Sequence, residues 1–261
     1  MNITDVDDKI IRDAIAAGET IEEFVKPYEA AFFEDLAKLN IKPAWKYPKA
    51  TEHIPEMIAL IKKLLARHLA YAADGSIYFA ISKFKPYGKL SRLHRRGMKT
   101  GARVDADEYK KQDARDFVLW KAEKASEPSW IAQFGDGRPG WHIECSAMSM
   151  KYLGTPFDIH SGGIDLIFPH HENEIAQSEG ATGKPFTRFF MEGEHLLVNG
   201  EKMSKSLGNV FTLRDFEKRN IRPFVFRYLA LTSHYRSKLN FTWESLESAQ
   251  HSLEKLYDFI R

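Results

Sequence analysis

The chain has 261 residues, of which 43% are hydrophobic and 13% aromatic, as is typical of a globular protein with a substantial core. Its net charge of +2 gives no compositional sign of nucleic-acid binding, so any RNA contact has to come from local basic patches. The single cysteine excludes an internal disulfide, and no apolar run is long enough to span a bilayer, so we expect a cytoplasmic protein without a membrane segment.

The first seventy residues are predicted to be largely helical. Residues 2–8 have the pattern of a strand end and a turn, and a helix is expected from Lys9. Helical periodicity continues over residues 18–70, with proline breaks and a second helix at about 56–70. The apolar stripes of these helices are expected to form core: Ile21, Phe24, Val25, Tyr28, Phe32, Phe33, Leu36 and Leu39, then Met57, Leu60, Ile61, Leu64 and Leu65.

The next segment opens with a turn at residues 73–75 that leads into a predicted strand at 76–81. A basic stretch follows over residues 89–103, which is either a contact for a phosphate backbone or a solvated loop. Residues 105–124 alternate in charge in the manner of a helix or a loop. Three apolar residues are expected to pack there, namely Phe117, Leu119 and Trp120.

A loop rich in glycine and proline, residues 135–140, precedes a helix expected over residues 143–153. Residues 157–160 have the pattern of a short buried strand, and this strand leads through a glycine pair to an aspartate: Gly162, Gly163 and Asp165. Open α/β sheets bind nucleotides at the carboxyl ends of their strands, and glycines let a ligand approach the backbone. The turn is therefore weak evidence for a nucleotide site.

Two short segments together suggest a metal site. Pro169 favours the first turn of a helix, and a helix that runs on from it places His170 and Glu174 at i and i+4 on one face. Cys145 is the only thiol of the chain, and thiolate, imidazole and carboxylate are all zinc ligands. The spacing lacks the density of CxxC or HExxH motifs, so a buried cysteine and a solvated helix pair remain the alternative.

A cationic loop lies at residues 200–209. Lys202 and Lys205 stand three apart in it, interleaved with hydroxyl side chains and flanked by glycines, and residues 189–198 are expected to form a strand and a hairpin before it. Such a loop suits a polyphosphate whose charge shifts during reaction, although a solvated turn has the same composition. The segment is not a Walker loop, because no GxxxxGK[ST] sequence occurs.

Helices are expected after Val210, including residues 224–232 and 243–260. The last of these carries an apolar stripe made of Leu246, Leu253, Leu256 and Ile260.

Taken together, these motifs resemble those of the cysteinyl-tRNA synthetases, a family of class I aminoacyl-tRNA synthetases. The resemblance covers nearly the whole chain, and several matching segments are specific to this family rather than common to class I. The segments are residues 2–10, 50–54, 101–104, 116–121, 137–146, 162–166, 202–206 (KMSKS) and 234–236.

The resemblance implies an α/β fold, namely the Rossmann-like nucleotide-binding fold of a class I synthetase, incomplete at its N-terminus. It also implies an inserted, mostly helical connective segment and a C-terminal helical stem region. The expected division is a remnant of the first half of the nucleotide-binding fold at 1–20, the connective insertion at 21–125, the second half with the zinc site and KMSKS loop at 126–209, and the stem-contact region at 210–261.

Roles for individual residues follow from the same resemblance. Thr4 and Trp141 would bind the substrate cysteine, and one Zn²⁺ would be held by Cys145, His170 and Glu174, with a further cysteine ligand of the family missing. Lys202 and Lys205 would be catalytic, because they would stabilise charge on the phosphates of ATP, which enters with Mg²⁺. The residues implied to contact ATP are Gly162, Gly163, Asp165, Lys202, Met203, Ser204, Lys205 and Ser206.

The implied function is that of a catalytic-core fragment of a cysteine–tRNA ligase, acting on cysteine, ATP and tRNA(Cys) through cysteinyl-adenylate. The protein is expected to be a monomer. The family's HIGH signature and anticodon-binding domain are not found in the sequence, so we expect the isolated chain to have little or no aminoacylation activity. Two alternatives stay open. One is a ligase that joins cysteine to an amino sugar in mycothiol synthesis, and the other is a truncated, non-catalytic protein that binds zinc or nucleic acid.

Overall fold

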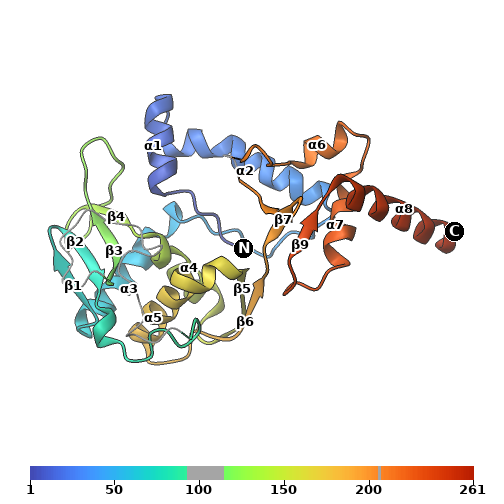
Figure 1. The fold of residues 1–261 in the computed structure, drawn as a ribbon. Helices are drawn as coiled ribbons and strands as arrows, with labels where there is room; N and C mark the ends of the chain where they lie inside the picture. The colour runs from blue at the N-terminus through green and yellow to red at the C-terminus, as the bar shows by residue number, and fades with distance from the viewer. Residues whose placement is uncertain (93–114, 205–206) are drawn as a thin grey trace. The chain divides into compact units, whose positions relative to one another are not determined.

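The computed structural model describes residues 1–92, 115–204 and 207–261, and the chain divides into two compact units (Figure 1). Unit 1 consists of Met1–Val25, Trp45–His160 and Asp165–Met191, and unit 2 of Lys26–Ala44, Ser161–Ile164 and Glu192–Arg261. The four-part division expected from the sequence stays a prediction, and most of the basic stretch at 89–103 lies outside the described residues. In the described ranges, no helix has the length and apolar character needed to cross a membrane.

Unit 1 begins with a well-capped helix. The side chain of Asp7 accepts a hydrogen bond from the Ile10 amide, which fixes the start of α1 (Asp8–Ala17) one residue before the expected position. Gly18 ends the helix in the left-handed conformation, with φ of 72°, which a glycine adopts without a steric cost. Helix α3 (Ile54–Ala66) then buries its predicted stripe at Met57, Leu60, Ile61 and Leu64.

An antiparallel sheet in the order β1-β2-β3-β4 forms one side of unit 1. Its strands are β1 (Ala70–Ala73), β2 (Ser76–Phe79), β3 (Phe117–Ala122) and β4 (Gly137–Pro139). The strand predicted at 76–81 is confirmed over Ser76–Phe79, whereas Ile81 begins a 3₁₀ turn. The helix or loop expected up to residue 124 is wrong in its described part, because β3 pairs on both sides and buries Phe117, Leu119 and Trp120.

The centre of unit 1 is formed by α4 (Trp141–Leu153) and α5 (Glu172–Thr182), which pack against each other and against α3. Helix α4 begins two residues earlier than expected, directly after Gly140. Helix α5 begins three residues later than the predicted Pro169 start. It follows a 3₁₀ turn (Ile164–Leu166) and a π-helical turn (Ile167–His171) in which Phe168 has extended backbone angles.

Two burial predictions are wrong. Helix α2 (Ile21–Lys38) buries no residue, and Tyr28 is 65% exposed, because charged side chains are spread around the helix. Strand β5 (Phe157–Gly163) pairs with β6 (Thr187–Gly193) and buries only Phe157, since these two strands form a two-stranded sheet among the described residues.

Unit 2 has its own core around a small three-stranded sheet, β8-β7-β9. Strands β7 (Leu196–Val198), β8 (Glu201–Lys202) and β9 (Leu239–Phe241) are accompanied by α6 (Leu213–Glu217), α7 (Pro223–Leu231) and α8 (Trp243–Ile260). The expected stripe of α8 is confirmed in its first half, at Leu246 and Leu253. Leu256 and Ile260 are exposed, because the buried residues of α8 end at Leu253.

Candidate functional site

The two packed helices of unit 1 bring the predicted metal ligands together. Cys145 lies one turn into α4, while His170 precedes α5 and Glu174 lies in its first turn. The three side chains offer a sulfur, a ring nitrogen and a carboxylate oxygen that all lie within 4.8 Å of one another. His170 Nε2 is 3.8 Å from Glu174 Oε2 across the expected i, i+4 spacing.

Burial shifts the pKa of each of these groups in the direction that disfavours its charged form. It raises the pKa of the Cys145 thiol, and the nearby carboxylates Glu174 and Glu144 raise it further. Burial also raises the pKa of Glu174, and it lowers the pKa of His170 to about 2, together with the charges of neighbouring histidines. A neutral imidazole is the form that binds a metal ion.

One oxygen of the cluster has no partner. Glu174 is fully buried, and within the described part of the chain its Oε1 makes no hydrogen bond. A buried carboxylate oxygen without a donor is costly unless a cation or a proton joins it. The orphaned oxygen belongs to the carboxylate whose Oε2 lies near the His170 imidazole, and the set of sulfur, imidazole and carboxylate fits Zn²⁺, which takes these donors at tetrahedral sites with one position left open.

Two histidines that the sequence did not single out hold the ligands in place. His160 Nε2 lies 2.8 Å from Glu174 Oε2, which leaves Oε1 as the free atom. His142 Nδ1 lies 2.9 Å from His170 Nδ1. His171, expected to be either a supporting group or a surface residue, is buried, and together with His160 and Glu174 it forms a second group of close donor atoms.

The proposed cysteine-binding residues lie around the same cluster. Trp141 packs its ring 4.4 Å from that of His170, at an interplanar angle of 45°. Thr4 is linked to it through Asn2, whose side-chain nitrogen is 3.5 Å from Thr4 Oγ1 and 3.3 Å from Cys145 Sγ. The sequence placed Asn2 in a matching segment but gave no sign that it would reach the thiol.

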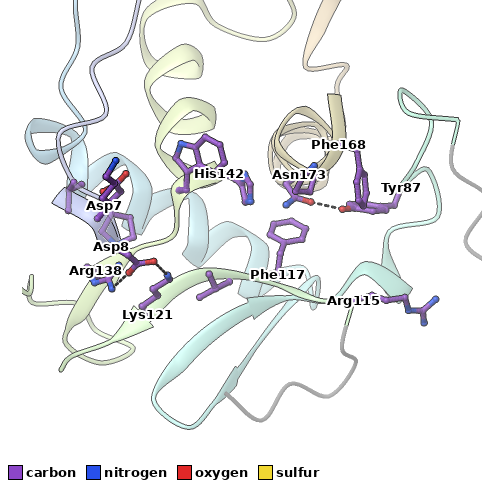
Figure 2. Close-up of a pocket in the computed structure, with 16 residues that line it drawn as sticks. Asp7, Asp8, Tyr87, Arg115, Phe117, Lys121, Arg138, His142, Phe168 and Asn173 are labelled. Carbon is purple, nitrogen blue, oxygen red and sulfur yellow. Dashed lines mark hydrogen bonds and ion pairs between the residues drawn. The ribbon is translucent and has the colours of Figure 1, made fainter. Parts of the chain in front are cut away.

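A cavity of about 370 Å³ adjoins the cluster, and Trp141 and His142 belong to its lining (Figure 2). One end of it is charged: Lys121 donates to Asp8 at 2.7 Å, and Arg138 donates to the other oxygen of the same carboxylate. The other end is aromatic, and the Tyr87 hydroxyl donates to Asn173 Oδ1 there. Its volume falls within the range of small-molecule sites.

The residues predicted to bind ATP are divided between the units. Gly162 and Gly163 end β5 and belong to unit 2, whereas Asp165 lies in the following 3₁₀ turn and belongs to unit 1. The expected glycine turn is therefore part of the strand, because the pairing of β5 continues through it. Lys205 and Ser206 lie outside the described residues.

The described part of the KMSKS loop follows a tight hairpin, as predicted. Asn199 and Gly200, with φ of 50° and 81°, connect β7 to β8, which ends at Lys202. Asn209 makes two hydrogen bonds to the loop. Its side-chain oxygen accepts from the Ser204 amide at 2.8 Å, and its side-chain nitrogen donates to the Lys202 carbonyl at 3.1 Å. Met203 packs against the core of unit 2.

Comparison with solved structures shows which fold the chain has. A methionyl-tRNA synthetase of Mycobacterium tuberculosis, solved in complex with methionyl-adenylate, matches 92% of this chain and 57% of its own, with a TM-score of 0.65 and 16% identity. At this identity the match establishes the fold alone, which the chain shares with this methionyl-tRNA synthetase.

Sequence comparison is more specific. A family described as "tRNA synthetases class I (C) catalytic domain" matches residues 1–251, and the chain belongs to this family. Similar curated proteins include the cysteine–tRNA ligases of Protochlamydia amoebophila, 55% identical over 267 residues, and Leptospira interrogans, 54% identical over 262 residues. All of this chain is covered in both alignments, and it spans 56% of the length of each relative.

Proposed function

We propose that the chain is the catalytic-core portion of a cysteine–tRNA ligase, a monomeric cytoplasmic enzyme that activates cysteine with ATP and transfers it to tRNA(Cys). The observation that carries the proposal is the convergence of Cys145, His170 and Glu174, a buried carboxylate with one orphaned oxygen, in one cluster. The names of the curated relatives support tRNA, rather than an amino sugar, as the acceptor.

Selection of cysteine over serine is the chemical problem that this cluster would solve. The two amino acids differ in one atom, and an apolar pocket separates such near-isosteres poorly. Zn²⁺ held by Cys145, His170 and Glu174 would supply a soft cation that prefers a thiolate to a neutral hydroxyl. Trp141 and Thr4 would border the pocket, so that the bound amino acid is aligned by an aromatic wall on one side and polar groups on the other.

Activation is a phosphoryl reaction in which positioning and charge neutralisation supply most of the rate. An oxygen of the cysteine carboxylate forms a bond to the α-phosphorus of ATP, and the bond to the pyrophosphate oxygen breaks. Lys202 is exposed and has no ion pair among the residues described, so its ammonium group is free to meet the phosphates, with Lys205 and Mg²⁺ in the same role. A ribose hydroxyl of tRNA then attacks the activated carbonyl carbon, and AMP leaves.

Cobalt substitution tests the amino-acid specificity without requiring turnover. The chain is loaded with Co²⁺, and its absorption spectrum is followed as cysteine or serine is added. Cysteine should strengthen the thiolate-to-cobalt band, and serine at the same concentration should leave it unchanged, because the hydroxyl is a poor ligand. Equal responses to both amino acids, or none to cysteine, would refute the proposal.

A further inference from the structure

The turn between β7 and β8 contains the only Asn-Gly pair of the sequence, Asn199-Gly200. Every other asparagine is followed by isoleucine, glutamate, valine or phenylalanine. Asparagine loses its side-chain amide most readily before glycine, because glycine has no side chain to obstruct the attack of its own backbone nitrogen on the preceding amide carbon. The sequence therefore contains one position where this reaction is sterically easy.

The structure leaves the Asn199 side chain free to react. Asn199 and Gly200 are both exposed, and a Cβ built on Gly200 would meet nothing within 4 Å, so the space around the turn is open. Among the residues that the structure describes, the Asn199 side chain has no hydrogen-bond partner that would hold it away from the Gly200 nitrogen.

Asn240 on β9 opposes the reaction. The parallel pairing of β7 with β9 sets Asn240 against Leu197, and the Asn240 side-chain oxygen accepts a hydrogen bond from the Gly200 amide at 2.6 Å. This amide nitrogen is the nucleophile of deamidation, and it attacks only after it has lost its proton. A hydrogen bond donated by the neutral amide disfavours the loss of that proton, so the contact with Asn240 lowers the reactivity of the nitrogen.

We propose that Asn199 is a deamidation site of the folded chain and that the hydrogen bond from the Gly200 amide to Asn240 sets the rate of the reaction. The Gly200 nitrogen forms a bond to Cγ of Asn199, and the side-chain nitrogen leaves as ammonia, with the proton that Gly200 gives up. Water then opens the cyclic imide at either of its carbonyl groups. One opening gives aspartate, and the other gives isoaspartate, whose main chain runs through the former side chain.

Isoaspartate at position 199 would change the hairpin, because it adds a methylene group to the main chain of a turn whose length fixes the strand register. The pairs of Leu197 with Lys202 and Val198 with Glu201 close directly on this turn. The modification would therefore displace Lys202, at the start of the KMSKS loop. Only the effect of this displacement on the activation of cysteine rests on the proposed function, and the deamidation itself does not.

Mass spectrometry of proteolytic peptides tests the site. The parent, Asn240→Ala and Asn240→Asp are incubated at pH 7.5, and the conversion of amide to acid is followed at each asparagine. Asn240 is exposed, so its replacement does not threaten folding. We expect Asn199 to react about fivefold faster in Asn240→Ala than in the parent, as loss of one hydrogen bond to the nucleophile implies. Asn240→Asp is the matched control, because it keeps an oxygen for the Gly200 amide and should react no faster than the parent.

Unfolded protein provides a second control. In concentrated urea the hydrogen bond to Asn240 is lost, so the parent and Asn240→Ala should react at the same rate at Asn199. A difference that persists in urea would show that the substitution acts without the folded hairpin, and the role of Asn240 would be refuted. The remaining asparagines in the same digests are internal standards and should react much more slowly than Asn199.

Three results in the folded protein would overturn the proposal. The first is no deamidation at Asn199 in either the parent or Asn240→Ala. The second is the same rate in these two proteins. The third is equal acceleration in Asn240→Ala and Asn240→Asp, because loosening of the hairpin, and not loss of the acceptor, would then control the rate.

Discussion

His142 Nδ1 lies 2.9 Å from His170 Nδ1, so one of these two buried imidazoles donates a hydrogen bond to the other. With its Nδ1 engaged, His170 offers Nε2 to the cluster, and that atom is the one near Glu174. Hydrogen bonds of this kind fix the tautomer and ring orientation of a metal-binding histidine. We therefore expect His142 to act as a positioning residue for the proposed metal site.

Removing this hydrogen bond should weaken metal binding. We expect His142→Phe to lower the Zn²⁺ affinity by about 10- to 100-fold, as is typical for loss of a partner of a ligating histidine. Asn places an amide near the position of Nδ1, so His142→Asn should restore much of the affinity. Competition with a chromophoric chelator measures both. His53→Gln is the control, since His53 is another buried histidine that bonds to Tyr152 and not to the cluster. Equal affinity in the Phe variant and the parent would contradict the assignment.

Glu174 should increase the stability of the chain when metal is bound and decrease it when metal is absent. Its buried Oε1 has no donor among the described residues, and burial raises its pKa, so the charged form is unfavourable without a cation. Glu174→Gln keeps an oxygen for His160 and removes the buried charge. We expect it to abolish tight metal binding and to raise the thermal midpoint of the chelator-treated chain at pH 7.5. If the metal-free variant had a lower thermal midpoint than the metal-free parent, the carboxylate would be a net stabiliser and the prediction would be wrong.

The metal-free chain should lose stability in mild acid. Burial lowers the pKa of His142 and His171 to about 3 and that of His170 to about 2, whereas an unfolded histidine titrates at about 6.5. Below that pH the unfolded state binds more protons, so each histidine removes up to about 1.4 kcal/mol per pH unit. Glu174 and Glu144 act in the opposite direction, because their raised pKa values favour the folded chain as pH falls, but three histidines outweigh two carboxyl groups.

Urea denaturation at pH 7.5, 6.0 and 5.0 measures this dependence in chelator-treated protein. We expect the unfolding free energy to fall at each step, and His171→Asn to reduce the slope because one of the three groups is removed. A constant free energy of unfolding across this range would contradict the burial of the histidines.

Glu172 should make a large contribution to the stability of unit 1. Its buried carboxylate accepts hydrogen bonds from the backbone amides of Gly88, Leu90 and Ser91 and from the Ser91 hydroxyl. Glu172→Ala leaves several buried donors unpaired, at a cost of about 3 kcal/mol or more. Glu172→Gln retains an acceptor and should cost less. Denaturant titration orders the two variants, and an alanine variant as stable as the parent would refute the role of the carboxylate.

The sequence predicted that Cys145, His170 and Glu174 would lie together, from their ligand types, the i, i+4 spacing of His170 and Glu174 and the family resemblance, and the structure brings the three side chains together. It did not predict the supporting groups, because Asn2, His142 and His160 meet the cluster only through tertiary packing of different elements. No spacing rule connects residues on a terminal segment, a helix and a strand.

The prediction of secondary structure was likewise limited to elements that local pattern determines. The periodic helix at 54–66 and the strand at 76–79 were predictable from local pattern, and so was the Asn199-Gly200 hairpin. The strand over Phe117–Ala122 was not predictable, because charged residues surround it in the sequence and local pattern does not reveal that it pairs on both sides. The exposure of α2 was missed because an apolar stripe says nothing about whether a partner surface covers it.

The most direct test of the proposed metal site is the zinc content of the purified chain, with the Cys145→Ala and Ser149→Ala variants compared with the parent. Ser149 donates to the Cys145 carbonyl and offers nothing to the cluster, so it is the matched control on the same helix. We predict about one zinc per chain in the parent and in Ser149→Ala, and close to none in Cys145→Ala. Zinc retained in full by Cys145→Ala, or absent from all three proteins, would contradict the central claim that Cys145, His170 and Glu174 form a metal site.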